Sequence, residues 1–149
     1  MTQEEKDLLS KDICGRMPYG VKIETEYFTK ATLISIRKNI SYGVCKDLLV
    51  TYDISNEETP FQTDERSSTI SKIKPYLFPL SSMTEEQKEE IEDKLIFPNN
   101  SDGGWMEILY NNKYEIPFWF VDFCNKNHLD YRGLIPMGLA INATGLDIY

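Results

Sequence analysis

The sequence predicts an α+β fold: an N-terminal helix, a small curved antiparallel β-sheet or an SH3-like or Sm-like barrel, and a helical C-terminal part. Three patterns support this fold class. A capped helical pattern opens the chain, three segments with period-two alternation follow within residues 21–54, and helical patterns return after residue 81. We expect residues 1–80 to form the helix and the barrel-like sheet, and residues 81–149 to form a helical part packed on it. A chain of 149 residues can bury the core of one such compact domain.

The first helix is predicted from its N-terminal cap. Thr2 and Glu5 have the capping-box spacing, in which each side chain accepts a hydrogen bond from the other residue's backbone amide. The helix is expected to run to about Cys14, because Gly15 is a plausible stop and Pro18 prevents a longer continuation. Its apolar stripe consists of Leu8, Leu9 and Ile13.

The next segments alternate with a period of two, which is typical of half-buried strands. In "VKIETEYF" (residues 21–28) the alternation predicts one shared face, made of Val21, Ile23, Thr25 and Tyr27. "KATLISIRK" (30–38) and "VCKDLLVTYDI" (44–54) are predicted as the second and third strands, joined by a turn at 39–43.

The middle of the chain is more irregular. The polar residues 54–69 are predicted to form a long exposed loop, and "TISKIK" (69–74) a further strand that closes the sheet. "PYLFPL" (75–80) is expected to cross the barrel in an extended path, because its two prolines restrict the backbone.

Two more helices are predicted in the C-terminal part. In "SSMTEEQKEEIEDKL" (81–95), Thr84 and Gln87 repeat the capping-box spacing. "EIPFWFVDFCNKNHL" (115–129) reads as a helix with Pro117 in its first turn, and it is apolar nearly all round. Such a helix is buried on most sides or meets a partner. Residues 98–104 are predicted as a loop, and residues 105–110 as a short strand or extended arm.

Charge and cysteine content limit the function classes. The net charge is −8, and residues 81–149 carry 12 acidic against 5 basic residues, which argues against a protein that wraps duplex DNA. The three cysteines are widely separated, so we expect free thiols of a reducing compartment. No apolar run reaches the ~20 residues of a membrane helix, and the polar N-terminus does not read as a secretion signal. The sequence therefore predicts a cytoplasmic protein with no membrane partner.

Three stretches resemble a family of small uncharacterised proteins encoded in gut-bacterial genomes, often in prophages and other mobile elements. They are "PYGVKI", "IKPYLFPLSSMTEE" and "HLDYRGLIPMGLA", which lie in both ends and the middle of the chain. The family's "HHFDYRGLIEKGLA" departs from this chain, which has Asn127 in place of the first histidine and Pro136 and Met137 in place of "EK". The resemblance transfers no catalytic residues, and it implies a phage-like or prophage-like accessory protein in the cytoplasm of a bacterial host cell.

The stretch "FCNKNHLDYRGLI" (123–135) holds the one histidine of the chain and raises an enzyme hypothesis. Cys124 and His128 are four residues apart, so on a helix they would share a face, with Asp122 or Asp130 as an orienting acid. However, Cys124 lies late in its predicted helix, where the helix dipole disfavours a thiolate. The same residues could supply three metal ligands, but the paired spacing of a structural zinc site is absent. We therefore expect no catalytic residue, no metal and no cofactor.

The preferred interpretation of residues 123–135 is a polar corner that stabilises a turn. His128 and Asp130 would lie at a helix end, where a cation near the last carbonyls is favourable. Arg132 could bind Asp130, Asp122 or a free carbonyl, and Gly133 would allow a sharp turn. The alternative use is contact with a partner, for which the candidate residues are Trp119, Tyr131 and Arg132.

A second alternative concerns the basic segment between residues 22 and 46. Small barrels bind single-stranded nucleic acid by combining a positive groove with stacking aromatic rings. The candidates for such a face are Lys22, Tyr27, Lys30, Arg37, Lys38 and Lys46. Taken together, the sequence favours a non-enzymatic accessory protein that binds an unidentified host or phage protein. Single-stranded nucleic-acid binding is the first alternative, and an enzyme that uses Cys124 and His128 is the second.

Overall fold

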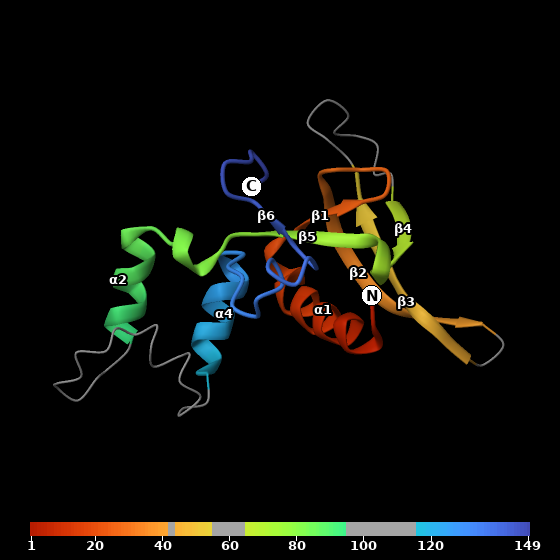
Figure 1. Ribbon diagram of the computed structural model, residues 1–149, viewed down its shortest axis with the longest axis horizontal. Coiled ribbons are helices and arrows are strands. Elements are labelled where there is room, and N and C mark those ends of the chain that lie inside the picture. The colour runs from red at the N-terminus through yellow and green to blue at the C-terminus, as the bar shows by residue number, and fades with distance from the viewer. Residues whose placement is uncertain (42–43, 55–64, 95–115) are drawn as a thin grey trace.

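The computed structural model describes residues 1–41, 44–54, 65–94 and 116–149 and confirms the α+β class (Figure 1). Helix α1 (Gln3–Arg16) begins with the predicted capping box: the Thr2 amide donates to Glu5 Oε2 at 2.6 Å, and the Glu5 amide donates to Thr2 Oγ1 at 3.2 Å. The helix does not stop at Gly15 as predicted. It continues through the 3-10 turn η1 (Met17–Tyr19) to Gly20, whose φ of 68° is the left-handed conformation that ends a helix.

In the described ranges, six strands form a single mixed sheet with the order β4-β3-β2-β1-β5-β6. All neighbours are antiparallel except β5 and β6, which are parallel. The strands are β1 (Lys22–Thr25), β2 (Ala31–Ser41), β3 (Val44–Asp53), β4 (Glu65–Thr69), β5 (Ile73–Leu77) and β6 (Ile141–Asn142).

The first three predicted strands are confirmed, with differences at their ends. Strand β2 extends to Ser41, into the predicted turn, and β4 forms in the last residues of the predicted loop. In β1 the alternation holds for Ile23 and Thr25, which are buried, as is Val21 just before the strand. It fails at Tyr27, which is 80% exposed because the chain turns back between β1 and β2.

The sheet is strongly curved, as its connections require. Strands β4 and β5 stand four positions apart in the strand order, which would be about 19 Å in a flat sheet. They are joined only by the three-residue turn η2 (Ile70–Lys72), and such a link spans at most about 14 Å. The sheet must therefore curl so that β4 and β5 approach each other.

The predicted closure into an SH3-like or Sm-like barrel is wrong, because the sheet remains open. The side of β5 that faces away from β1 pairs with β6 instead of β4, through Tyr76 with Ile141 and Leu77 with Asn142. Pro75 is tolerated in β5 because β6 begins to pair only at the next residue. The C-terminal part of the chain thus occupies the position that the closing strand of a barrel would need.

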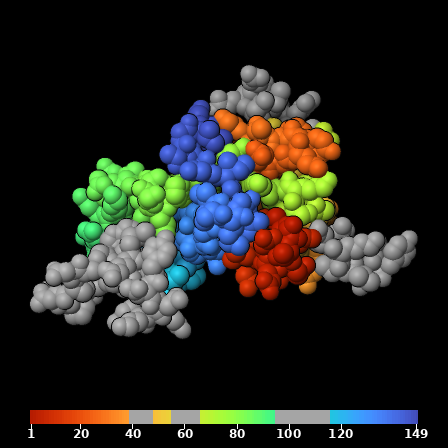
Figure 2. Space-filling model, in the orientation of Figure 1, coloured from red at the N-terminus to blue at the C-terminus, as the bar shows by residue number. Residues whose placement is uncertain are grey.

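Two hydrophobic clusters stabilise the fold. The larger one lies between α1 and the sheet and includes Leu9, Ile13, Val21 and Ile73, together with Leu134 from near the C-terminus. The smaller one gathers residues of α2 (Glu85–Lys94), α4 (Phe118–Lys126) and the turn η3 (Leu80–Ser82). In Figure 2 residues 116–149, in cyan and blue, lie between α1 and the green segment that includes α2.

The C-terminal helices begin near their predicted starts. The Thr84 amide donates to Gln87 Oε1 at 3.0 Å and the Gln87 amide to Thr84 Oγ1 at 3.3 Å, so the second capping box is present. In α4, Phe120 and Phe123 are buried, but Phe118 is 84% exposed. The predicted 98–104 loop and 105–110 strand lie outside the described residues. Among the described helices, none is both long and apolar enough to cross a membrane.

Candidate functional site

A buried ion pair underlies the polar corner of residues 123–135. Arg16 and Asp12 of α1 are both fully buried, with Arg16 Nε 2.6 Å from Asp12 Oδ2 and Nη2 3.0 Å from Oδ1. The same guanidinium donates to the carbonyl oxygens of Cys124 at 3.2 Å and Leu129 at 2.8 Å. Arg16 is therefore the cation near the last carbonyls of α4. The sequence pattern had predicted that this cation would come from residues 123–135.

Asp130 holds the bend that follows α4. Its carboxylate accepts hydrogen bonds from the backbone amides of Leu134 and Ile135, both at 2.8 Å. Its own amide donates to the Phe78 carbonyl at 2.7 Å, which joins the corner to the end of β5. Gly133 has a φ of 72°, as the predicted sharp turn requires.

Arg132 differs from the prediction, because it reaches neither Asp130 nor Asp122. Its Nε lies 3.5 Å from Asp12 Oδ1, which is an ion-pair distance but not a hydrogen bond. Asp130 is occupied by backbone amides, and Asp122 accepts a hydrogen bond from the Tyr19 hydroxyl at 2.6 Å. That bond raises the pKa of Tyr19 above its ordinary value.

His128 is a buried neutral side chain rather than the predicted cation. Burial, and secondarily the Arg16 charge, lower its pKa from 6.5 to about 4. Its ring stacks on Tyr149, with centroids 4.0 Å apart and the planes 14° from parallel. It is also the one described residue other than glycine with a positive φ, 53°.

Cys124 and His128 do not form the arrangement that a nucleophilic pair needs. His128 lies beyond the last residue of α4, Lys126, so the helical four-residue spacing does not apply. Cys124 is fully buried, and burial raises its pKa to about 12. Near neutral pH the two groups are a thiol and a neutral imidazole, the opposite of a thiolate and an imidazolium. Within the described ranges, no three His, Cys, Asp or Glu residues converge on a possible metal position.

The candidate partner-contact residues make contacts within the chain. The Tyr131 ring has the Arg16 guanidinium 5.6 Å and the Arg132 guanidinium 4.8 Å from its centroid. Trp119 is half-buried. Its ring is perpendicular to that of Phe120, with the centroids 5.9 Å apart, and the Lys94 ammonium lies 5.8 Å from its centroid. The structure brings Tyr131 and Arg132 together, while Trp119 packs on α2.

The described basic candidates do not all lie on one face of the sheet. Lys22 Nζ donates to Thr32 Oγ1 at 2.7 Å, and Lys30 Nζ donates to the Asp147 carbonyl. Arg37 and Lys38 are exposed but are neighbours on β2, and successive strand residues point to opposite faces of a sheet. The side chain of Lys46 lies outside the described residues.

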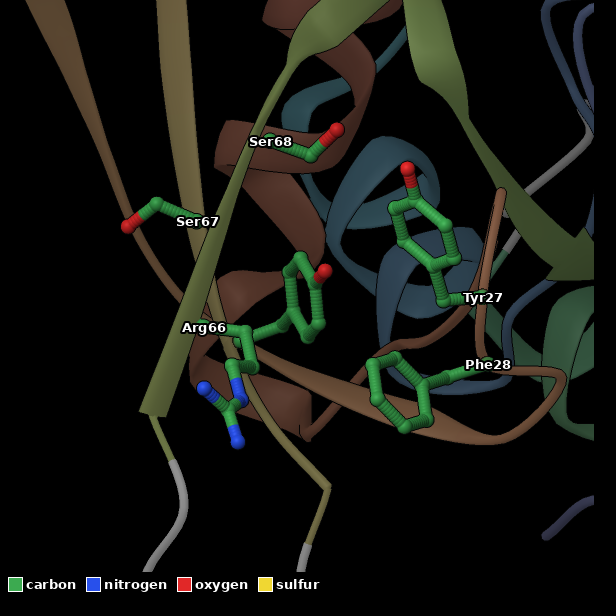
Figure 3. A pocket seen from close by; sticks show the side chains of 6 residues that line it. Tyr27, Phe28, Arg66, Ser67 and Ser68 are labelled. Atoms are coloured by element: carbon green, nitrogen blue, oxygen red, sulfur yellow. The ribbon is translucent and has the colours of Figure 1, made fainter.

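Tyr27 instead contributes to a hollow that we call the Tyr27 hollow, with a volume of about 410 Å³ (Figure 3). Its lining residues are Tyr27, Phe28, Tyr52, Arg66, Ser67 and Ser68. Tyr27 and Phe28 come from the turn between β1 and β2, and the other four come from β3 and β4. Figure 3 shows the two aromatic rings of the turn facing the Arg66 and Ser68 side of β4 across the open space.

Two parts of these sites were not predicted from the sequence. Asp12 and Arg16 follow Leu9 by three and seven residues, so they lie on the apolar stripe of α1, and a charged pair in that position signals burial. Arg66 and Ser68 gave no signal, since β4 was not predicted and its neighbours in the hollow are distant in sequence. Comparison with protein-family models, curated proteins and solved structures found no match to this chain.

Proposed function

We propose that the chain is a non-enzymatic accessory protein that acts by binding another protein, and that the Tyr27 hollow is its binding surface. The observation that carries the proposal is the exposure of Tyr27 on a rigid turn. The ring is 80% exposed, yet the Thr25 hydroxyl accepts hydrogen bonds from the amides of Tyr27 at 3.3 Å and Phe28 at 3.0 Å. Tyrosine is among the residues that contribute most to protein interfaces.

The composition of the hollow also supports a binding role. The rings of Phe28 and Tyr52 are in tilted contact, with their centroids 6.3 Å apart, so they form an apolar part of the hollow's lining. The volume of about 410 Å³ is in the range of pre-formed binding pockets. The phage or prophage context implied by the resemblance is compatible with a partner from the host or the phage.

An affinity experiment with matched variants tests this function. The full chain, Tyr27→Ala and Phe118→Ala are immobilised and exposed to a bacterial lysate, and captured proteins are quantified by mass spectrometry. Phe118 is a matched control because it is similarly exposed, 84%, and lies on α4, away from the hollow. We expect a protein that the wild type and Phe118→Ala capture equally, and that Tyr27→Ala captures about tenfold less. Equal capture by all three chains would contradict the assignment of the hollow.

Single-stranded nucleic-acid binding is the second candidate, favoured by the combination of three aromatic rings with Arg66 in one hollow. The dispersed basic residues and the net charge of −8 weigh against it. Fluorescence anisotropy with a labelled single-stranded oligonucleotide at low salt separates the two functions. Binding that weakens steeply with salt and is lost in Tyr27→Ala would favour this second candidate.

A further inference from the structure

His128 is a buried titratable residue that the proposed function does not use. It is 8% exposed, and its Nδ1 has no hydrogen-bond partner within the described structure. Its φ of 53° lies in the left-handed region, which costs free energy for residues other than glycine and often accompanies functional sites. A neutral ring nitrogen of this kind can accept a proton, but here the resulting N–H would find no acceptor.

The backbone around His128 is held in place by neighbouring elements. The His128 amide donates to the Asn125 carbonyl at 3.3 Å, and the His128 carbonyl accepts a hydrogen bond from the Phe78 amide at 2.9 Å. The next carbonyl, that of Leu129, accepts a hydrogen bond from Arg16 at 2.8 Å. The imidazole therefore cannot reach water by leaving the corner unless these bonds break.

The charge that acts on the imidazole is positive. After burial, the Arg16 guanidinium of α1 is the main cause of the lowered pKa of His128, and a hydrogen bond with the Tyr19 backbone opposes both only in part. A second guanidinium is close by, since Arg132 Nε lies 3.5 Å from the Asp12 carboxylate that Arg16 binds. A proton on His128 would therefore add a cation to a buried site that already contains one.

The carboxylates of the corner already have partners. Both oxygens of Asp12 are bound by Arg16, at 2.6 and 3.0 Å. Asp130 accepts hydrogen bonds from two backbone amides, and Asp122 accepts one from the Tyr19 hydroxyl. Since these three carboxylates are engaged, an imidazolium at position 128 would need water to stabilise its charge.

Tyr149 covers the imidazole and separates it from water. Its ring stacks on His128, with the centroids 4.0 Å apart and the planes 14° from parallel. It belongs to residues 143–149, which follow β6 and which we call the C-terminal latch. Water can reach the imidazole without disturbing the corner if this latch moves.

The C-terminal latch is attached to the rest of the molecule by few contacts. Residues 144–147 are exposed, and the hydrogen bonds from Leu146 to Ala143 and from Ile148 to Leu146 stay within the latch. Its described hydrogen bonds to other segments join Ala143 to Leu77, Thr144 to Asn142, Lys30 to the Asp147 carbonyl, and the Tyr149 hydroxyl to Lys22 and Tyr76. Exposed segments with few outward bonds open at a lower free energy than the core.

We propose that residues 143–149 are a proton-operated latch, which opens in mild acid when His128 takes up a proton while the helices and the other strands stay in place. The proton comes from the solvent and binds Nδ1, and the opened latch lets water stabilise the charge. Opening also uncovers the Phe78 ring, whose centroid lies 5.9 Å from that of Tyr149 in the closed form. This device goes beyond the proposed function and does not depend on the Tyr27 hollow.

Proton linkage gives the size of the effect. The closed form excludes the proton until about pH 4, whereas an imidazole in contact with water binds it near pH 6.5. The ratio of open to closed latch should therefore rise about twentyfold as the pH falls from 7 to 5. At higher pH the ratio should become constant, because neither form then carries the proton.

Hydrogen exchange read by nuclear magnetic resonance measures this opening in the full chain. The reporters are the Lys22 amide, which donates to Tyr149, and the Ala143 amide, which donates to Leu77. After correction for the intrinsic effect of pH on exchange, the protection of both amides should fall about twentyfold between pH 7 and 5. Low concentrations of urea should leave it unchanged, because a local opening exposes little surface, whereas amides between β2 and β3 should respond to urea.

His128→Asn is the matched variant, because asparagine tolerates the left-handed backbone and does not titrate. In this variant the protection of the two reporter amides should not change between pH 7 and 5. A second measurement needs no substitution: the ring resonances of His128 are those of the one histidine in the chain, and they should titrate with a midpoint well below pH 6.5.

Three results would overturn the proposal. If urea accelerates exchange at Lys22 and Ala143 as much as between β2 and β3, the latch opens only when the whole molecule unfolds. If the protection of the reporter amides is independent of pH, or falls equally in His128→Asn, His128 does not control the opening. A ring titration with its midpoint near pH 6.5 would show that the latch does not keep the proton from His128.

Discussion

Arg16 is the residue on which the junction between α1, α4 and the corner depends. It neutralises a fully buried carboxylate and donates to the carbonyls of Cys124 in α4 and of Leu129 in the turn that follows. Replacing both members of a buried pair with apolar residues can be nearly neutral, but removing one member leaves an uncompensated charge. The loss of stability on removing Arg16 alone is therefore larger than the net contribution of the intact ion pair to stability.

Arg16→Met is expected to destabilise the fold by about 3–5 kcal/mol, because Asp12 would remain buried without its hydrogen-bonded partner and with only the more distant Arg132 Nε, at 3.5 Å, beside it. Urea unfolding followed by circular dichroism measures the change. Lys11→Met is the matched control, since Lys11 is an exposed cation on the same helix, and it should change the stability by less than about 0.5 kcal/mol. The double variant Asp12→Leu/Arg16→Met should be more stable than Arg16→Met alone. A loss below about 1 kcal/mol for Arg16→Met would contradict the buried pair.

His128 is expected to make the protein less stable in mild acid. The unfolded chain binds a proton on this residue near pH 6.5, whereas the folded chain excludes it until about pH 4. The contribution of His128 to the free energy of unfolding is therefore fully present above pH 6.5 and is lost as the pH falls toward 4. At pH 4.5 the loss is on the order of 2 kcal/mol.

The control for this prediction is His128→Asn, because asparagine tolerates the left-handed backbone at φ 53° and does not titrate. Denaturant unfolding of both proteins between pH 7 and 4.5 should show a steeper loss for the wild type. Since His128 is the one histidine of the chain, protonation of carboxylates accounts for the rest of the dependence of stability on pH in both proteins. Parallel stability curves would show that the His128 pKa is not lowered.

At the residue scale, the sequence indicated the polar corner but assigned its contacts to the wrong residue. Asp130 and Gly133 were recognised as turn residues, and both have that role. The cation was sought in His128 or Arg132, because they are near in sequence. Arg16 is more than 100 positions away from the carbonyls that it binds, so only the tertiary fold could identify it.

At the scale of elements, α1 and α4 approach each other closely at Gly15. A Cβ atom at this position would lie 2.7 Å from Nδ2 of Asn125, whose side chain is buried. Gly15 therefore serves helix packing rather than helix termination. This explains why a glycine lies within α1, where it costs about 1 kcal/mol relative to alanine.

Gly15→Ala should destabilise the protein by about 1 kcal/mol, although alanine is the better helix former, because Asn125 has to move in a packed interface. Asn125→Ala removes the obstructing side chain, so Gly15→Ala should become stabilising in that background. The four chains of this double-mutant cycle are compared by thermal unfolding. Stabilisation by Gly15→Ala in both backgrounds would contradict a close contact at this position.

Elements with strong local signals were predictable, and those that depend on neighbours were not. Both capping boxes and the three alternating strands were identified from spacing alone. Strand β4 is polar, as an edge strand can be, so its composition resembled a loop. Strand β6 has only two residues and exists because β5 pairs with it, which no periodicity can show.

At the scale of the whole molecule, the C-terminal segment connects separate parts of the fold. The Tyr149 hydroxyl accepts a hydrogen bond from the Lys22 amide of β1 at 3.2 Å and donates to the Tyr76 carbonyl of β5 at 2.8 Å. Its ring stacks on His128 of the corner. The pKa of Tyr149 is raised, chiefly by burial, so the hydroxyl remains protonated and able to donate. One side chain thus joins the sheet to the polar corner.

Tyr149→Phe is expected to lower the stability by about 1–2 kcal/mol, because the ring stack remains while a backbone amide and a carbonyl lose their partner. Tyr149→Ala should cost more, since it also removes the stack on His128 and the ring contact with Phe78, whose centroid lies 5.9 Å away. Hydrogen exchange read by nuclear magnetic resonance gives the local effect: the Lys22 amide should exchange faster in Tyr149→Phe. Tyr149 does not contact α2 in the described structure. The exchange rates of the α2 amides should therefore change only as much as the global stability requires. If Lys22 keeps its protection in both variants, the C-terminal segment does not hold the sheet and the corner together.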